Sequence, residues 1–174
     1  MRAFNLLLVA PLALASVVKR QSASATNEGI TAISEAVEAL TNAVNAYKGG
    51  AVEAGPVFNA SLEVHRVNRA AKAAADASGR FSSEESKAIV DNVFSSVGVT
   101  IPISVKAIEA KKPLFDAAEI TSLVKATIDL LQFDHRTFSL STGAKLSLDQ
   151  VASGLIGAGE IDAVLTGASL FYTL

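Results

Sequence analysis

The sequence predicts an all-α protein, built as an antiparallel bundle of five to six helices. Apolar residues recur every three or four positions over several long stretches, which is the spacing of one face of a helix. Gly and Pro residues separate these stretches at positions suited to short loops. No stretch shows the alternation of apolar and polar residues that is typical of a strand. The 174 residues, half of them hydrophobic, suffice for one domain with a core.

The first twenty residues have the pattern of a secretory signal rather than of a folded segment. Arg2 supplies a positive charge, an apolar run follows from Phe4 to Leu14, and Ala13-Leu14-Ala15 has the small-x-small pattern of a cleavage site. The run is too short to cross a bilayer. The dibasic pair Lys19-Arg20 resembles a processing site of the fungal secretory type. We therefore expect a secreted, extracellular protein.

The expected organisation is a signal peptide with a short dibasic pro-segment over residues 1–20 and a helical-bundle domain over residues 21–174. Removal of the first segment takes three of the 15 basic residues and none of the 17 acidic ones, so the net charge moves from −2 to −5. A mildly acidic domain is a poor candidate for binding nucleic acid or an anionic membrane.

The first predicted helix runs from about Asn27 to Lys48. Its apolar residues follow one another at intervals of three and four, which gives an a/d seam along an amphipathic helix. The residues of this seam are Ile30, Ile33, Val37, Leu40, Val44 and Tyr47. Gly49-Gly50 is expected to end the helix.

The second and third predicted helices have clear start signals. Gly55-Pro56 opens the second helix, which reaches about Ser78 and carries an Ala-rich stripe suited to close packing. Ser82 and Glu85 have the spacing of a capping box. This pattern predicts a third helix from Ser83 to Val97.

The stretch around Pro113 predicts a corner between two helices. Pro102 is expected in the first turn of a short fourth helix, which must end just before Pro113 because proline disfavours the helical conformation of the residue that precedes it. Leu114 and Phe115 place apolar bulk at the corner. The fifth helix is expected from about Asp116 to Phe133 or beyond.

The C-terminal segment gives a weaker pattern. Ser147 and Gln150 have the spacing of a second capping box, which predicts that a last helix starts there. Gly154, Gly157 and Gly159 then interrupt the apolar periodicity. The sequence leaves open whether this segment docks on the bundle.

The residues offer little for catalysis or for a cofactor. The chain has no Cys, only two His, and no Walker loop, GxSxG or HExxH motif. Asp134 and His135 are adjacent on a helix and point away from each other, so they cannot orient one another. His65 falls on the inner line of the second helix, where a structural histidine is the simpler interpretation. We expect no enzymatic activity, no cofactor and no metal site.

The chain contains one N-x-S/T sequon, Asn59-Ala60-Ser61. In a secreted chain this pattern makes Asn59 a candidate N-glycosylation site. An unused match at a helix start is the alternative, and the sequence does not decide between the two.

The apolar seam permits two interpretations of the interior. Ile and Val seams beside many Ala residues bury less bulk than Leu and Phe cores, which favours an apolar slot between helices, sized for an aliphatic chain. An ordinary tight core is the simpler interpretation from the residues alone.

The stretch Ile108-Glu-Ala-Lys-Lys-Pro-Leu-Phe-Asp116, continued by Ile120-Thr-Ser-Leu-Val124, resembles the fungal hydrophobic surface-binding protein A family, which includes the antigenic cell-wall galactomannoproteins of moulds. The signal peptide, the early amphipathic helix, the Ser-rich cap and the Lys-Lys-Pro corner occur in the family's order and span about Met1 to Phe138. Beyond Ser139, a Gly-rich apolar segment stands where the family has a long, charged, Ala-rich helix. The resemblance implies a secreted, non-enzymatic bundle that binds fatty acids internally, or hydrophobic surfaces to which hydrolases are recruited.

On this resemblance we expect an apolar ligand, such as a fatty acid, to lie among side chains from several helices. Thr41 and Thr127 are candidate hydroxyl partners for its carboxylate. The predicted apolar contacts are Val37, Leu40, Val44, Val93, Phe94, Ile108, Phe115, Leu123 and Leu130. Two other functions stay open: an adaptor that coats hydrophobic polymers without an internal ligand, and a structural cell-wall mannoprotein. The sequence does not distinguish a monomer from a homodimer.

Overall fold

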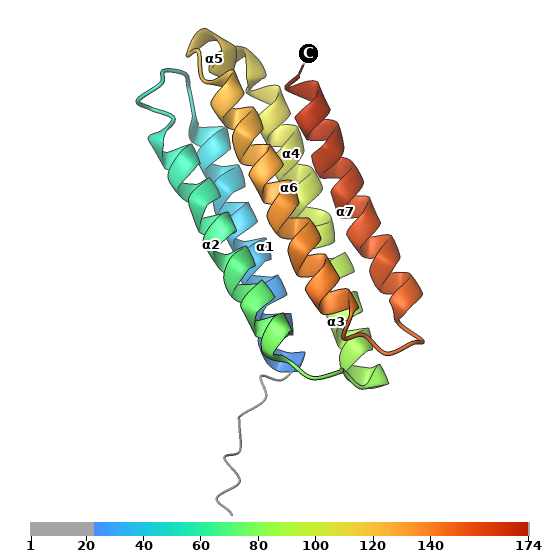
Figure 1. Cartoon of the computed structure of the whole chain (residues 1–174). Helices are drawn as coiled ribbons and strands as arrows, with labels where there is room; N and C mark the ends of the chain where they lie inside the picture. Colours follow the sequence, from blue (N-terminus) through green and yellow to red (C-terminus); the bar gives the residue numbers. More distant parts are fainter. Residues whose placement is uncertain (1–22, 174) are drawn as a thin grey trace, which may run out of the picture.

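The computed structural model describes residues 23–173, so the predicted signal peptide and dibasic segment lie outside the described residues. The helices of this range are α1 (Ala23–Ala46), α2 (Gly55–Ala77), α3 (Ser83–Ser95), α4 (Val97–Ala110), α5 (Lys112–Ala117), α6 (Thr121–Gly143) and α7 (Val151–Phe171). α3 and α4 form two parts of one rod and α5 is a short corner helix, so the described chain builds five long rods (Figure 1). The predicted all-α bundle is confirmed.

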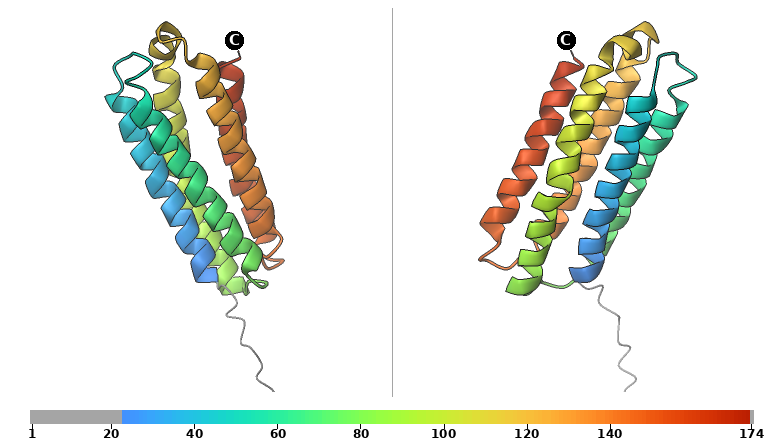
Figure 2. Two further views of the ribbon diagram at one scale, coloured as in Figure 1. Left: turned by 60° about the vertical axis from the view of Figure 1, so that its left-hand side comes forward. Right: turned by 180° about the vertical axis from the view of Figure 1, so that it is seen from behind.

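The five rods form a ring around a shared interior. α1 packs against α2 and α4, α2 against α6, α6 against α7, and α7 against α3 and α4. Rods that follow one another in the chain run in opposite directions, whereas α2 and α6 lie side by side in the same direction (Figures 1 and 2). A ring of this kind encloses space along its axis, and the size of the side chains decides whether that space is filled.

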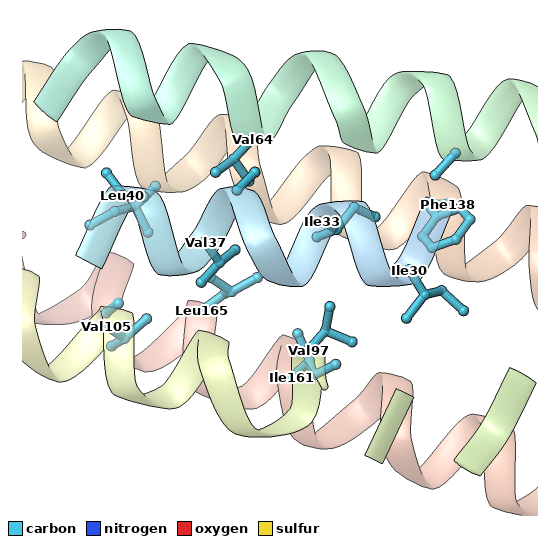
Figure 3. Close-up of a cluster of buried hydrophobic side chains, with 14 of the residues drawn as sticks. Ile30, Ile33, Val37, Leu40, Val64, Val97, Val105, Phe138, Ile161 and Leu165 are labelled. Atoms are coloured by element: carbon cyan, nitrogen blue, oxygen red, sulfur yellow. The ribbon is translucent and has the colours of Figure 1, made fainter. Parts of the chain in front are cut away.

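The seam of α1 points into the middle of the ring, as predicted. None of the six seam residues is more than 4% exposed. Burial of an aliphatic side chain of this size is worth about 1.5–3 kcal/mol. The side chains that meet the seam from the other helices include Val64, Val97, Val105, Phe138, Ile161 and Leu165 (Figure 3).

Two of the predicted helix ends are confirmed and one is wrong. Gly49 and Gly50 both have positive φ, +113° and +94°, and follow the end of α1. At the start of α3, the Ser82 N–H donates to a Glu85 carboxylate oxygen at 2.8 Å, and the Glu85 N–H donates to the Ser82 hydroxyl at 3.2 Å. The second predicted capping box does not form, because α7 begins after Gln150 and this residue makes no side-chain capping hydrogen bond.

The predicted corner is confirmed, although the flanking boundaries differ. α4 ends at Ala110, before Pro113, and the Phe115 ring is fully buried and stacks on Tyr47 with centroids 5.0 Å apart. Residues 112–117 form α5 and the next long helix starts at Thr121, because the chain turns through Glu119 with φ of 58°.

Pro102 lies inside α4 rather than in its first turn. α4 begins directly after Ser96, whose φ and ψ of −119° and −89° separate it from α3. The third helix was predicted to end at Val97, directly before Gly98, because Gly and Pro are the usual interruption signals. Here a single serine outside the helical region makes the break instead.

The C-terminal segment forms a regular helix that docks on the bundle. Ile161, Leu165 and Ala168 of α7 are buried at intervals of four and three residues. The Tyr172 hydroxyl donates to the Ile108 carbonyl of α4 at 2.7 Å. Since Ile108 lies near the corner, this hydrogen bond ties the last turn of the chain to that end of the ring.

Candidate functional site

A cavity of about 660 Å³ lies within the end of the bundle opposite the corner. It is bounded by the first half of α1, by α3 and the start of α4, by the second half of α6, and by the first half of α7. Its volume falls within the range of about 300–1,000 Å³ that is usual for small-molecule sites.

The lining of the cavity is mostly apolar and extends along the helices. On α7 the lining residues run from Val151 to Asp162, which corresponds to about 16 Å of helix rise. The apolar lining residues are Ile30, Ile33, Ile89, Val90, Val93, Phe94, Val97, Ile101, Phe138, Leu140, Leu146, Val151, Leu155 and Ile161. A long, narrow, apolar space suits an aliphatic chain better than a compact polar molecule.

Small residues on α7 explain both its close docking and the free volume. A Cβ atom at Gly154 would come within 2.5 Å of a Leu146 methyl group, so a larger residue there would force the Leu146 side chain to move. A Cβ atom at Gly157 would lie 3.2 Å from a Val93 methyl group and 3.3 Å from the Phe94 ring. Of the glycines that obscured the periodicity of this segment, Gly157 fits closely against α3 and Gly154 against Leu146, whereas a Cβ atom at Gly159 would meet nothing within 4 Å.

Two buried polar side chains that line the cavity have no hydrogen-bond partner among the described residues. These are the Asn68 amide oxygen on α2 and the Thr142 hydroxyl on α6. The residues are only 6% and 8% exposed, respectively. A buried polar atom left without a partner costs about 1–3 kcal/mol.

His135 contributes a third polar group, and its protonation state is fixed by its surroundings. Its Nε2 lies 3.0 Å from the Ala158 carbonyl oxygen, which can only accept, so this nitrogen carries the proton. Burial lowers the pKa of His135 below its ordinary value, which keeps the ring neutral near pH 7. Nδ1 is therefore an acceptor, and the Ser139 hydroxyl lies 3.5 Å from it.

An ion pair joins α6 and α7 among the residues that line the cavity. Arg136 donates from two nitrogens to the two carboxylate oxygens of Asp162, at 2.6 and 3.0 Å. The hydrogen bonds from Arg136 hold the pKa of Asp162 below its usual range. Leu140 and Leu155 line the cavity beside this pair and are also exposed to solvent. Apolar side chains at an opening give an incoming hydrocarbon chain a continuous apolar path.

A second polar cluster, between α2 and α6, does not line the cavity. His65 Nδ1 lies 2.8 Å from one carboxylate oxygen of Asp134, and Arg69 donates to the other at 3.3 Å. His65 and Asp134 are both buried, so the cluster satisfies polar groups at a helix interface. Asp134 and His135 bind different partners, as their adjacency predicts.

The predicted ligand contacts are distributed over several places in the structure. Val93 and Phe94 line the large cavity. Four others, Leu40, Ile108, Phe115 and Thr127, line a much smaller pocket of about 20 Å³ near the corner.

The remaining predicted contacts line neither space. Val37 and Val44 are buried in the core, whereas Leu123 and Leu130 are 50% and 39% exposed. The hydroxyl of Thr41 donates to the Val37 carbonyl at 2.8 Å, and that of Thr127 donates to the Leu123 carbonyl at 2.9 Å. Both threonine hydroxyls are thus already paired with their own helix backbone.

The polar lining residues were not predicted as ligand contacts. Asn68 lies on the predicted second helix, and His135 was considered only for catalysis, whereas Ser139 and Thr142 lie beyond the stretch with clear helical periodicity and belong to α6 in the structure. A search for polar residues at buried helical positions would have found them.

Two apolar segments meet around this cavity. Ser83–Ala110 and Val151–Phe171 are long and apolar enough to cross a membrane by length and composition, yet only 28% and 22% of their most apolar windows is buried in the fold. Core helices often meet the same criterion, so this is weak evidence for membrane insertion. Within residues 23–173, no group of three His, Asp or Glu side chains is placed to hold a metal ion.

Comparison with known proteins gives one family and several solved structures. The family model described as hydrophobic surface binding protein A matches residues 23–142, well over half of the chain. No curated protein matches the sequence.

The solved structures share the fold at low sequence identity. The crystal structure of Afmp4p in complex with palmitic acid is 23% identical and covers 86% of this chain and 99% of its own, with a TM-score of 0.83. Ligand binding domain 1 of Penicillium marneffei MP1, complexed with arachidonic acids, is 17% identical and covers 86% and 97%, with a TM-score of 0.81. Ligand binding domain 2 of the same protein, complexed with multiple arachidonic acids, has a TM-score of 0.80 at 17% identity and covers 86% and 94%.

Proposed function

The chain belongs to the hydrophobic surface binding protein A family, and from this premise we propose that its internal cavity holds the aliphatic chain of a lipid. The observation that carries the proposal is the elongated, mostly apolar cavity of about 660 Å³. Each methylene group transferred from water into it would contribute about 0.8 kcal/mol. A chain of sixteen carbons would then bind through its hydrocarbon part alone.

The solved structures of the same fold support this proposal. Afmp4p was solved with palmitic acid, and the two MP1 domains with arachidonic acids. A long hydrocarbon chain is the element common to these ligands. For the present chain, the proposed action is binding and sequestration rather than catalysis.

Filling the cavity tests the proposal. Ala158 lines the cavity, so Ala158→Phe would place a ring where the hydrocarbon is expected. The matched control is Ala163→Phe, on an exposed position of the same helix. The full chain would be expressed in a secreting host, delipidated, and tested by native mass spectrometry for uptake of palmitate and hexadecane.

We expect uptake by the wild type and by the control, and at least a tenfold loss in Ala158→Phe, since lost burial of about two methylene groups already exceeds 1.4 kcal/mol. Absence of uptake by the wild type would refute internal lipid binding, as would equal uptake by both variants.

A second candidate function, coating of hydrophobic surfaces, is favoured by exposed apolar residues on α6. Leu123, Leu130, Phe133 and Leu140 are all exposed and follow a helical stripe on the outer side of this helix. Exposed apolar side chains that gather on one face commonly mark interaction surfaces. Replacing Leu123, Leu130 and Phe133, which do not line the cavity, by Ser should reduce depletion of the protein by polyester powder while leaving lipid uptake intact. The cavity variant Ala158→Phe should show the opposite pattern.

We further propose that the protein is secreted and that Asn59 carries an N-linked glycan. Asn59 is exposed on α2, where a glycan would project into solvent without displacing a packed side chain. Expression in a fungal host with and without an endoglycosidase, beside an Asn59→Gln variant, tests both features. Recovery of the protein from the medium supports secretion. A fall in its mass on digestion, absent in the Asn59→Gln variant, supports glycosylation. A purely structural cell-wall mannoprotein would instead stay with the wall fraction and take up no lipid.

A further inference from the structure

We propose that Arg136 anchors the carboxylate of a fatty acid at the solvent-exposed edge of the cavity, and that Asp162 competes with this carboxylate for the same guanidinium group. This inference rests on the proposed function, because it requires the hydrocarbon part of the ligand to lie inside the cavity.

The solvent-exposed lining of the cavity lies mainly along α6 and α7. Leu140, Leu155 and Gly159 all line the cavity and are exposed. Among the described lining residues of α1 to α4, only Phe94 is exposed, at 40%. A ligand with its chain inside can therefore keep a charged head near water along α6 and α7, which avoids the cost of burying a carboxylate.

Arg136 is the cation at this edge. It is the only Lys or Arg among the described lining residues, and 56% of its side chain is exposed. Its two hydrogen bonds to Asp162 come from Nε and Nη2, so both N–H groups of Nη1 donate to no described residue. A ligand carboxylate can accept from this free side of the guanidinium group, and such charge-assisted hydrogen bonds are stronger than neutral ones.

Arg136 and Asp162 lie at one end of the cavity, which leaves the length of the cavity for the hydrocarbon. On α7 the lining runs from Val151 to Asp162, and on α6 it runs from His135 and Arg136 toward the loop that joins the two helices. A chain whose head is at Arg136 would therefore extend along about 16 Å of helix rise toward Val151. An anchor in the middle of the lining would instead divide this space.

Asp162 opposes the binding of a second carboxylate. Its oxygens accept from Arg136 at 2.6 and 3.0 Å, and Gln132 donates to one of them at 3.2 Å. Because the ion pair is neutral as a whole, an incoming carboxylate gains less from Arg136 than it would gain from an unpaired cation. Neutralising Asp162 should therefore strengthen fatty-acid binding.

This sign distinguishes an anchor from a structural ion pair. If the pair only held α6 against α7, loss of either partner would have the same effect on the ligand. If Arg136 is the anchor and Asp162 the competitor, loss of the two side chains has opposite effects.

Two ligands of equal acyl chain isolate the contribution of the head group. The delipidated full chain would be mixed at pH 7.5 with equal concentrations of palmitate and methyl palmitate, and native mass spectrometry gives the ratio of the two bound ligands. The ester keeps the chain and removes the charge. Because the ester leaves water more readily, the informative quantity is the change in this ratio between variants.

Arg136→Gln should lower the ratio of bound palmitate to bound ester by about tenfold, since a hydrogen bond to a charged group is worth about one order of magnitude or more. Asp162→Asn should raise the ratio by about threefold, a smaller effect because solvent and salt screen charges at a partly exposed site. The matched controls are Arg66→Gln and Glu63→Gln, which remove the partners of an exposed ion pair on α2 that does not line the cavity. Both controls should keep the wild-type ratio.

An unchanged ratio in Arg136→Gln would overturn the inference, and so would a shift in the same direction in Arg136→Gln and Asp162→Asn. If Arg136→Gln does not fold, a ratio that fails to rise in Asp162→Asn is still sufficient to refute it. Binding of neither ligand by the wild type would refute internal lipid binding itself. Binding of both ligands with equal ratios in all variants would leave lipid binding in place and refute only the anchor.

Discussion

At the corner end of the bundle, Phe115 is fully buried against Tyr47, and the space left between the helices is about 20 Å³. At the opposite end, the same five rods enclose about 660 Å³. The difference follows from side-chain size: aromatic rings fill the axis at the corner, whereas Gly and Ala residues of α7 face the other end. One ring of helices thus combines a packed half that fixes the rods with an open half that is free to bind a ligand.

Truncation of one Phe in each half gives the largest expected contrast. Phe115→Ala should lower the free energy of unfolding by about 3–5 kcal/mol, because it opens a void in a filled region. Phe138→Ala should cost clearly less, because its ring already borders the cavity. Urea denaturation of both variants measures this difference. Equal losses would mean that the two halves are packed alike in solution.

Removal of the capping box tests the end of the rod beside the cavity. Ser82→Ala should destabilise the protein by about 1 kcal/mol, because the Glu85 N–H loses its partner at the start of α3. Ser95→Ala is the control: its exposed hydroxyl donates only to the carbonyls of Asp91 and Asn92 in the same helix. Thermal unfolding of the two variants should show a lower midpoint for Ser82→Ala alone.

The same contrast separates what the sequence could predict from what it could not. The α1 seam, the α3 capping box and the Pro113 corner were predictable, because each rests on local spacing that packing then reinforces. The docking of α7 was not, because its glycines interrupt the amphipathic pattern that would reveal an inner face. A glycine that fits against Val93 is visible only once α3 is in place.

The candidate site was less accessible to sequence reasoning than the fold. Two predicted contacts, Val93 and Phe94, line the large cavity, and the ligand-binding role of the whole predicted set stays a prediction. A cavity forms where several helices all lack large side chains at facing positions. It therefore cannot be predicted from the residues of any single stretch. Nine of the eleven predicted contacts lie outside the large cavity, four of them around the small pocket near the corner.

The Thr142 hydroxyl is buried in the open half without a hydrogen-bond partner, which should lower the stability of the ligand-free protein. Thr142→Val preserves the volume and removes a buried polar group without a partner, so the ligand-free protein should gain about 1 kcal/mol. Thr26→Val, also buried and unpartnered, should gain a similar amount. Differential scanning calorimetry on delipidated protein measures both gains. A loss of stability in Thr142→Val would indicate that its hydroxyl is already satisfied.

The smallest expected effect is a pH dependence that belongs to the open half alone. Burial lowers the pKa of His135 from its ordinary value of 6.5, so the unfolded chain binds a proton more readily than the folded one. The stability that the neutral ring provides is present above pH 6.5 and is lost as the pH falls toward the folded pKa. Urea denaturation between pH 7.5 and pH 5 should therefore show a free energy of unfolding that falls with pH. His135→Gln should reduce this slope, since glutamine does not titrate.

Hydrogen exchange should locate the acid-induced loosening in α7 around Ala158, whose carbonyl accepts from His135, and not around Phe115. Equal loosening at both ends would mean that the bundle opens as one unit, and the distinction between a packed half and an open half would then not extend to its dynamics.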